Sequence, residues 1–173
     1  MKEDNSLYPL KFQPILKEKI WGGTKLKKLF NKQTDSDKIG ESWELSGFKG
    51  DESVVSNGFL AGNNLTELIE IYMGDLVGDK IFEEFGLTFP LLFKLIDAND
   101  DLSIQVHPDD ETAAQRHNSL GKTEMWYVID AEPDGELIVG FKNDCSRQEY
   151  LKALEEGHVA DLLKRVPVSK GDV

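Results

Sequence analysis

Gln105, His107 and Glu124 have the residue types and the spacing that could hold a divalent metal ion. Gln105 and His107 are two residues apart in a predicted strand, so their side chains share one face. Glu124 opens a neighbouring predicted strand and would add a carboxylate to one imidazole and one amide oxygen. This donor set suits zinc, although manganese or iron would accept the same ligands. The spacing also allows an alternative, in which His107 is an ordinary hydrogen-bonded or exposed strand residue.

Three more polar residues lie close to these candidates in the sequence. Lys94 interrupts an apolar run, and because an unpaired buried ammonium is costly, it must face a polar pocket or take the outward position of an edge strand. Ser103 precedes Gln105 by two residues and is either a contact for a sugar or phosphate oxygen or an ordinary strand serine. Lys122 precedes Glu124 by two residues and is either a phosphate contact or a solvated loop charge.

Short predicted strands and a few helices must position these residues. Two capping-box patterns and the helical spacing of apolar residues predict helices, which cover residues 24–30, 65–73, 79–85, 111–117 and 146–154. Apolar runs between turn residues predict strands, which cover residues 41–45, 89–96, 102–107, 125–129 and 136–141. The turn at residues 132–135 predicts a hairpin between the last two strands. Strand–turn–strand pairs of this kind favour an antiparallel β-barrel or sandwich, mainly β, with helical additions.

Composition and charge narrow the classes of partner. A chain of 173 residues with a formal net charge of −12 has room for one core and repels phosphate backbones, so we expect no nucleic-acid partner. A small anionic substrate would need locally placed lysines or a metal. The single cysteine, Cys145, and an N-terminus without the order of a signal peptide predict a cytoplasmic protein. The apolar stretches are too short to span a bilayer, so we expect no membrane role.

Several longer strings of residues resemble the type I mannose-6-phosphate isomerases of the cupin superfamily. The most specific strings are FPLLFK at residues 89–94, LSIQVHP at residues 102–108 and GKTEM at residues 121–125. The opening residues 7–26 and the string GESWE at residues 40–44 resemble the shorter bacterial branch of that family. The similarity extends over essentially the whole chain.

The resemblance implies a role for each candidate residue. It implies three zinc ligands, namely Gln105, His107 and Glu124. It implies a sugar-phosphate pocket lined by three further residues, Lys94, Ser103 and Lys122. Within these two groups, Lys94 and Lys122 are the candidates for catalytic groups, and Ser103, Lys94 and Gln105 are the candidates for substrate contacts.

The resemblance also implies a cupin-type barrel in which residues 1–173 form the N-terminal part of a single catalytic domain, with a helical insertion at about residues 64–86. In the family the fourth metal ligand is a histidine in a later motif that begins with a Gly-Asp pair. Gly171-Asp172-Val173 matches the start of that motif. We therefore expect the 173-residue chain to be a truncated, inactive portion of the enzyme.

The implied reaction interconverts mannose 6-phosphate and fructose 6-phosphate, with zinc as the cofactor and a hexose 6-phosphate as the small-molecule partner. A Lewis-acidic ion would stabilise negative charge on the substrate oxygen, while an acid/base group moves a proton between C1 and C2. The base is left open among a metal-bound water, a lysine and a group outside this sequence. The alternative function is a non-catalytic cupin-like module that senses a sugar phosphate or a metal. The sequence does not indicate an oligomeric state.

Overall fold

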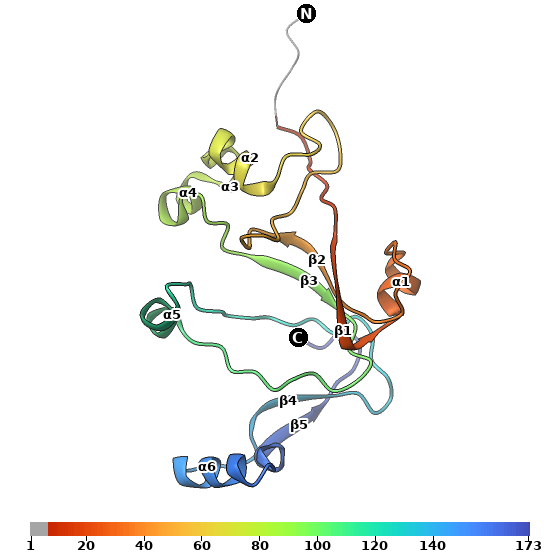
Figure 1. Ribbon diagram of the computed structural model, residues 1–173, viewed down its shortest axis with the longest axis vertical. Helices are drawn as coiled ribbons and strands as arrows, with labels where there is room; N and C mark the ends of the chain where they lie inside the picture. Colours follow the sequence, from red (N-terminus) through yellow and green to blue (C-terminus); the bar gives the residue numbers. More distant parts are fainter. Residues whose placement is uncertain (1–6) are drawn as a thin grey trace, which may run out of the picture. The chain divides into compact units, whose positions relative to one another are not determined.

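A computed structural model describes residues 7–173 of the chain, and Figure 1 traces them. The chain divides into two compact units, Met1–Ser103 and Ile104–Val173. Each unit has its own antiparallel sheet and its own helices. The assignment of the whole chain to one catalytic domain stays a prediction.

The first unit contains a three-stranded antiparallel sheet. Its strands are β1 (Ile15–Gly23), β2 (Ile39–Ser46) and β3 (Leu92–Ile96), in the spatial order β1-β2-β3. The central strand β2 therefore pairs with both neighbours, and β1 and β3 are edges. This arrangement confirms the predictions of a strand at residues 41–45 and of a strand within residues 89–96.

Four helices accompany this sheet. They are α1 (Lys25–Phe30), α2 (Leu65–Tyr72), α3 (Gly74–Val77) and α4 (Asp79–Phe85), and the last three lie close together in Figure 1. The predicted capping box starts α2, because the Asn64 side chain accepts from the Glu67 backbone and the Glu67 side chain accepts from the Asn64 backbone. Gly86, with φ 57°, ends α4 as predicted. The predicted helices within residues 64–86 are thus confirmed, while their status as an insertion in a catalytic domain stays a prediction.

The apolar core of the first unit lies where α2 meets the segment before it. Val55 and Leu68 are fully buried, and Leu60 completes the cluster. Partly buried apolar side chains pack around them: Leu7, Tyr8, Leu10, Phe12, Tyr72 and Leu76. The chain that leads into β1 is therefore held by this core.

The second unit contains a two-stranded sheet and three helical segments. In chain order they are α5 (Asp110–His117), β4 (Glu136–Phe141), α6 (Arg147–Glu155), the 3-10 helix η1 (Val159–Leu162) and β5 (Leu163–Pro167). The predicted capping box of Ser146 and Glu149 starts α6. β4 pairs with β5 in antiparallel fashion, with Leu137 opposite Val166.

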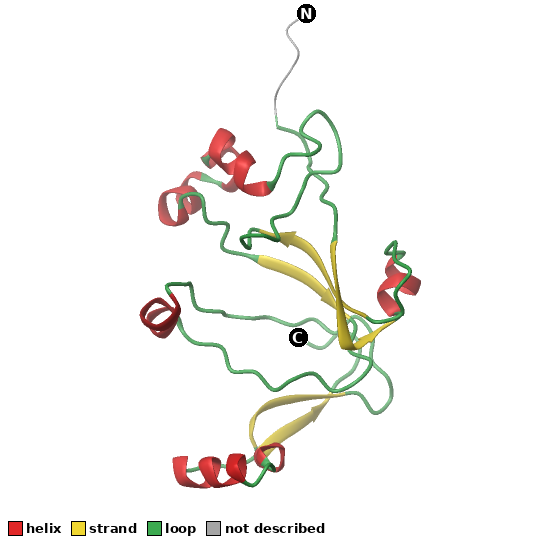
Figure 2. Ribbon diagram, viewed as in Figure 1, coloured by secondary structure: helices red, strands yellow, loops and turns green. Residues whose placement is uncertain are grey.

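Two predicted strands that follow β3 in the chain are wrong in this structure. Residues 102–107 and 125–129 form no strand, and Figure 2 shows both segments as loop. A strand requires a hydrogen-bonded partner, and alternating side chains alone do not provide one. The predicted hairpin between residues 125–129 and β4 is also wrong, because β4 takes β5 as its partner. Val128 has a short pairing with Gly171 and Asp172.

The fold class is therefore mixed rather than mainly β. Antiparallel sheets with helical additions are present as predicted, but each sheet is open and small. Among the described residues, no helix has both the length and the apolar character needed to cross a membrane.

Candidate functional site

His107, Glu124 and Lys122 meet in the second unit. The Nε2 atom of His107 lies 3.2 Å from one carboxylate oxygen of Glu124, and the Nζ atom of Lys122 lies 3.1 Å from the other. The side chains of His107 and Glu124 are 26% and 28% exposed. A carboxylate held between an imidazole and an ammonium thus lies at a partly shielded position, where electrostatic interactions are stronger than in open solvent.

Helix α5 and the loop after it bring these residues together. Asp109 caps α5 by accepting from the Thr112 backbone at 2.8 Å. Hydrogen bonds from the Thr112 side chain and from the Thr112 backbone lower the pKa of the Asp109 carboxyl. Asn118, with φ 49°, ends the helix in the left-handed region. The loop then turns back, and the backbone of Gly121 donates to the Asp110 carboxylate at 2.9 Å.

Gly121 is needed for this close approach. A Cβ atom at this position would lie 2.6 Å from the Asp109 carbonyl carbon and 2.6 Å from the Asp110 nitrogen. The next residue, Lys122, donates its backbone N–H to the Pro108 carbonyl at 3.2 Å. The chain before α5 and the chain after it are therefore fastened side by side, which places Glu124 beside His107.

The donor atoms present fit a divalent metal ion. Two ligand atoms that are each about 2.0–2.1 Å from a tetrahedral zinc ion lie about 3.3 Å apart. The observed separation of 3.2 Å between His107 and Glu124 agrees with this value. Gln105 lies two residues before His107, with an exposed side chain. Within residues 7–173 no three His, Cys, Asp or Glu side chains form a metal-holding group, so an ion at this position would need an amide oxygen such as that of Gln105.

Lys94 belongs to the first unit and has a buried partner. Its Nζ atom donates to Glu41 at 3.0 Å, and its side chain is 20% exposed. In β3 the exposed position is taken by Phe93 instead, at 64% exposure. Lys94 thus lies on an edge strand, but it does not take the outward position that one of the two interpretations from the sequence gave it. Ser103, an exposed residue, ends the first unit.

Sequence reasoning did not identify Glu41 as a candidate residue. Burial of this carboxyl raises its pKa, but hydrogen bonds from Trp43 and Lys94, together with the charges of Lys94 and Lys19, outweigh burial and lower the pKa below its ordinary value. The signal available in the sequence was an acidic residue two positions before a tryptophan in a predicted strand. A single sequence does not pair that strand with Lys94.

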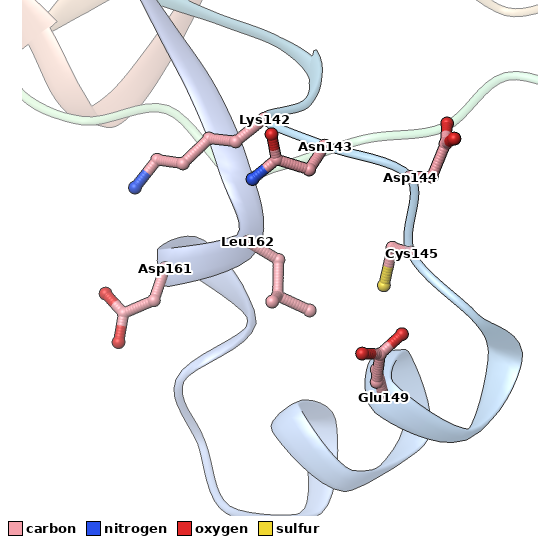
Figure 3. Close-up of a pocket in the computed structure, with 7 residues that line it drawn as sticks. All are labelled: Lys142, Asn143, Asp144, Cys145, Glu149, Asp161 and Leu162. Carbon is pink, nitrogen blue, oxygen red and sulfur yellow. The ribbon is translucent and has the colours of Figure 1, made fainter.

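Two hollows in the structure contain none of the predicted site residues. The first, of about 180 Å³, lies in the second unit, and Figure 3 shows the Cys145 sulfur and the Glu149 carboxylate turned toward each other there. Its lining includes three carboxylates, those of Asp144, Glu149 and Asp161, and a single lysine, Lys142. This excess of negative charge does not suit a phosphate. The second, of about 510 Å³ in the first unit, has a mainly apolar lining.

Comparison with known proteins identifies the family. Residues 9–148 match the model of the catalytic domain of type I phosphomannose isomerases. The chain belongs to the type I phosphomannose isomerase family. It is 44% identical over 168 residues to the mannose-6-phosphate isomerase ManA of Bacillus subtilis, and 40% identical over 164 residues to the mannose-6-phosphate isomerase of Streptococcus mutans. Each alignment covers 95% of this chain and 50% of the relative.

A solved structure supports the same assignment. The crystal structure of the mannose 6-phosphate isomerase from Bacillus subtilis aligns with a TM-score of 0.84 and 38% identity. The alignment covers 96% of this chain and 51% of that chain. This type I phosphomannose isomerase chain therefore spans about half the length of the curated relatives that it matches.

Proposed function

We propose that the protein is a zinc-dependent isomerase that interconverts mannose 6-phosphate and fructose 6-phosphate. The observation that carries the proposal is the convergence of His107, Glu124 and Lys122 in a chain of the type I phosphomannose isomerase family. The names of the relatives supply the substrate, since those from Bacillus subtilis and Streptococcus mutans are called mannose-6-phosphate isomerases. We also propose that the two units belong to one cupin-type catalytic domain with an antiparallel barrel.

Gln105, His107 and Glu124 would hold the metal ion. His107 offers a neutral imidazole nitrogen, Glu124 a carboxylate oxygen and Gln105 an amide oxygen, which are donors that zinc accepts. When bound, the ion would supply Lewis acidity toward the oxygen atoms of the substrate. Lys122, at 3.1 Å from Glu124, balances the charge of that ligand and holds its second oxygen in place.

The remaining roles follow from the charge of a hexose 6-phosphate. The chain carries a formal charge of −12, so the phosphate must be met by local cations. We assign Lys94 and Lys122 to this task, as point charges that can also stabilise negative charge developing during proton transfer between C1 and C2. Ser103 has a hydroxyl that would donate to, or accept from, a sugar or phosphate oxygen. Gln105 is assigned to the substrate as well as to the metal.

The experiment that tests this function is a coupled assay of fructose 6-phosphate formation. The protein, in the form in which the cell makes it, is assayed with mannose 6-phosphate before metal removal, after metal removal and after addition of zinc. We expect turnover to be lost on removal and restored by zinc. Turnover that survives complete metal removal would contradict the metal assignment, and no turnover with zinc bound would contradict the isomerase assignment.

A further inference from the structure

Glu41 is a buried carboxylate for which the proposed chemistry has no assigned use. The residue is 8% exposed, and one of its carboxylate oxygens accepts from the Lys94 ammonium at 3.0 Å. The other oxygen accepts from the indole N–H of Trp43 at 3.0 Å and lies 3.9 Å from the ammonium of Lys19. Buried carboxylates are uncommon unless they are paired, so this set of partners explains why the charge is tolerated.

The sheet fixes the distance between Glu41 and Lys94. Trp43 of β2 lies directly opposite Lys94 of β3, and Glu41 lies opposite Ile96. Residues two apart on a strand share a face, so Glu41, Trp43 and Lys94 all project from the same side of the sheet. Glu41 and Lys94 are diagonal neighbours, a separation that long side chains bridge. The contact is thus between two paired strands and does not depend on a loop.

The ion pair leaves Lys94 with both charge and donors to use. The pKa of Glu41 is lowered, so the carboxylate is charged at neutral pH. Lys94 and Lys19 together place two positive charges around this single negative charge. An ammonium has three N–H donors, and Glu41 accepts from one of them. The other two can bind an anion while the side chain stays in one position.

We propose that Glu41 is a positioning residue that holds the ammonium of Lys94 in place for the phosphate group of a hexose 6-phosphate. Trp43 supports this arrangement by fixing the second oxygen of Glu41. A lysine side chain is flexible, and a partner that fixes it in advance reduces the entropy lost when the phosphate binds. The inference rests on the proposed role of Lys94 in binding the substrate phosphate.

The test is a double-mutant cycle on ligand binding. The dissociation constant of fructose 6-phosphate is measured by calorimetry for the wild type, Glu41→Gln, Lys94→Met and the double variant. We expect Glu41→Gln to weaken binding roughly tenfold, because a neutral amide oxygen holds the Lys94 ammonium less tightly than a carboxylate does. The same substitution should have almost no further effect once Lys94 is Met. In the assay of turnover, the KM for mannose 6-phosphate should change more than kcat.

Other outcomes separate this inference from the proposed function. Equal losses of affinity with and without Lys94, or unchanged affinity in Glu41→Gln, would overturn the positioning role. Glu44→Gln is the matched control, because Glu44 lies in the same strand as Glu41 and pairs with Lys32 at 2.7 Å, a contact that serves only the fold. If both variants lower the melting temperature and lose affinity in parallel with it, the positioning role would also be overturned. A protein that binds fructose 6-phosphate through Glu41 and Lys94 but has no turnover would support the positioning role and contradict the isomerase function.

Discussion

Replacing Gly121 with Ala should disturb the candidate metal site without touching any ligand. The new Cβ atom would lie 2.6 Å from two backbone atoms at the start of α5, Asp109 C and Asp110 N. Backbone atoms cannot move aside as a flexible side chain can, so the loop must shift. Overpacking of this kind costs about 1–3 kcal/mol of unfolding free energy. A shift of the loop carries Glu124 away from His107, and we expect zinc affinity to fall roughly 10- to 100-fold, as it does when groups that orient metal ligands are lost.

The assay for Gly121→Ala combines zinc titration calorimetry with urea unfolding of the metal-free protein. Gly135→Ala is the matched control, because it also adds a methyl group in the second unit, where the closest atom to the new Cβ is Glu132 O at 3.1 Å. We expect the control to keep the zinc affinity of the wild type. Wild-type affinity and stability in Gly121→Ala would refute the argument that this close approach positions Glu124.

Three more predictions follow from single contacts. Asp97→Ala should lower the unfolding free energy by about 1–2 kcal/mol, and Asp97→Asn by less in the same urea unfolding measurement, because the buried Asp97 carboxylate accepts from the Lys25 backbone at 2.6 Å where α1 begins. The Glu41 carboxyl has a lowered pKa, so its stabilising contribution should be present above pH 4.5 and lost as the pH falls through the pKa of the folded protein. A difference in unfolding free energy between the wild type and Glu41→Gln that stays constant below pH 4.5 would contradict this. Lys122→Met should raise the KM for mannose 6-phosphate while changing the unfolding free energy by less than about 1 kcal/mol, since the Lys122 side chain is 42% exposed. Unchanged kinetics would argue against a phosphate contact.

Local signals in the sequence predicted local structure correctly. The two capping boxes, at Asn64 and Ser146, mark the starts of α2 and α6 because the hydrogen bonds that define them join residues only three positions apart. Gly86 ends α4 for a similar reason, since a left-handed residue is required at that position.

Pairings between distant segments were not predictable in the same way. Residues 102–107 alternate as a strand does, yet they form no strand in this structure, and the turn at residues 132–135 did not determine the partner of β4. The contact between Glu41 and Lys94 joins residues 53 positions apart and depends on the register of β2 and β3. A single sequence does not contain that register, which is why Glu41 was missed.

The candidate metal ligands were predictable from the sequence only in part. Spacing offered Gln105 and His107 as residues on one face of a strand and Glu124 at the start of a neighbouring strand, and neither strand is formed. The approach of His107 to Glu124 depends instead on the turn of the chain around α5 and on Gly121. Residue types and spacing, and then the family resemblance, both named this pair, but neither supplies the turn that brings the two residues together. The roles of all three ligands stay predictions.

Elemental analysis after dialysis tests whether Gln105, His107 and Glu124 bind one zinc ion. The protein, in the form in which the cell makes it, is prepared as wild type, His107→Ala, Glu124→Ala and the control His117→Ala, in which an exposed histidine at the end of α5 is removed. We predict about one zinc per chain in the wild type and in the control, and loss of most of the metal in the other two variants. Zinc content in His107→Ala equal to that of the wild type would contradict the account.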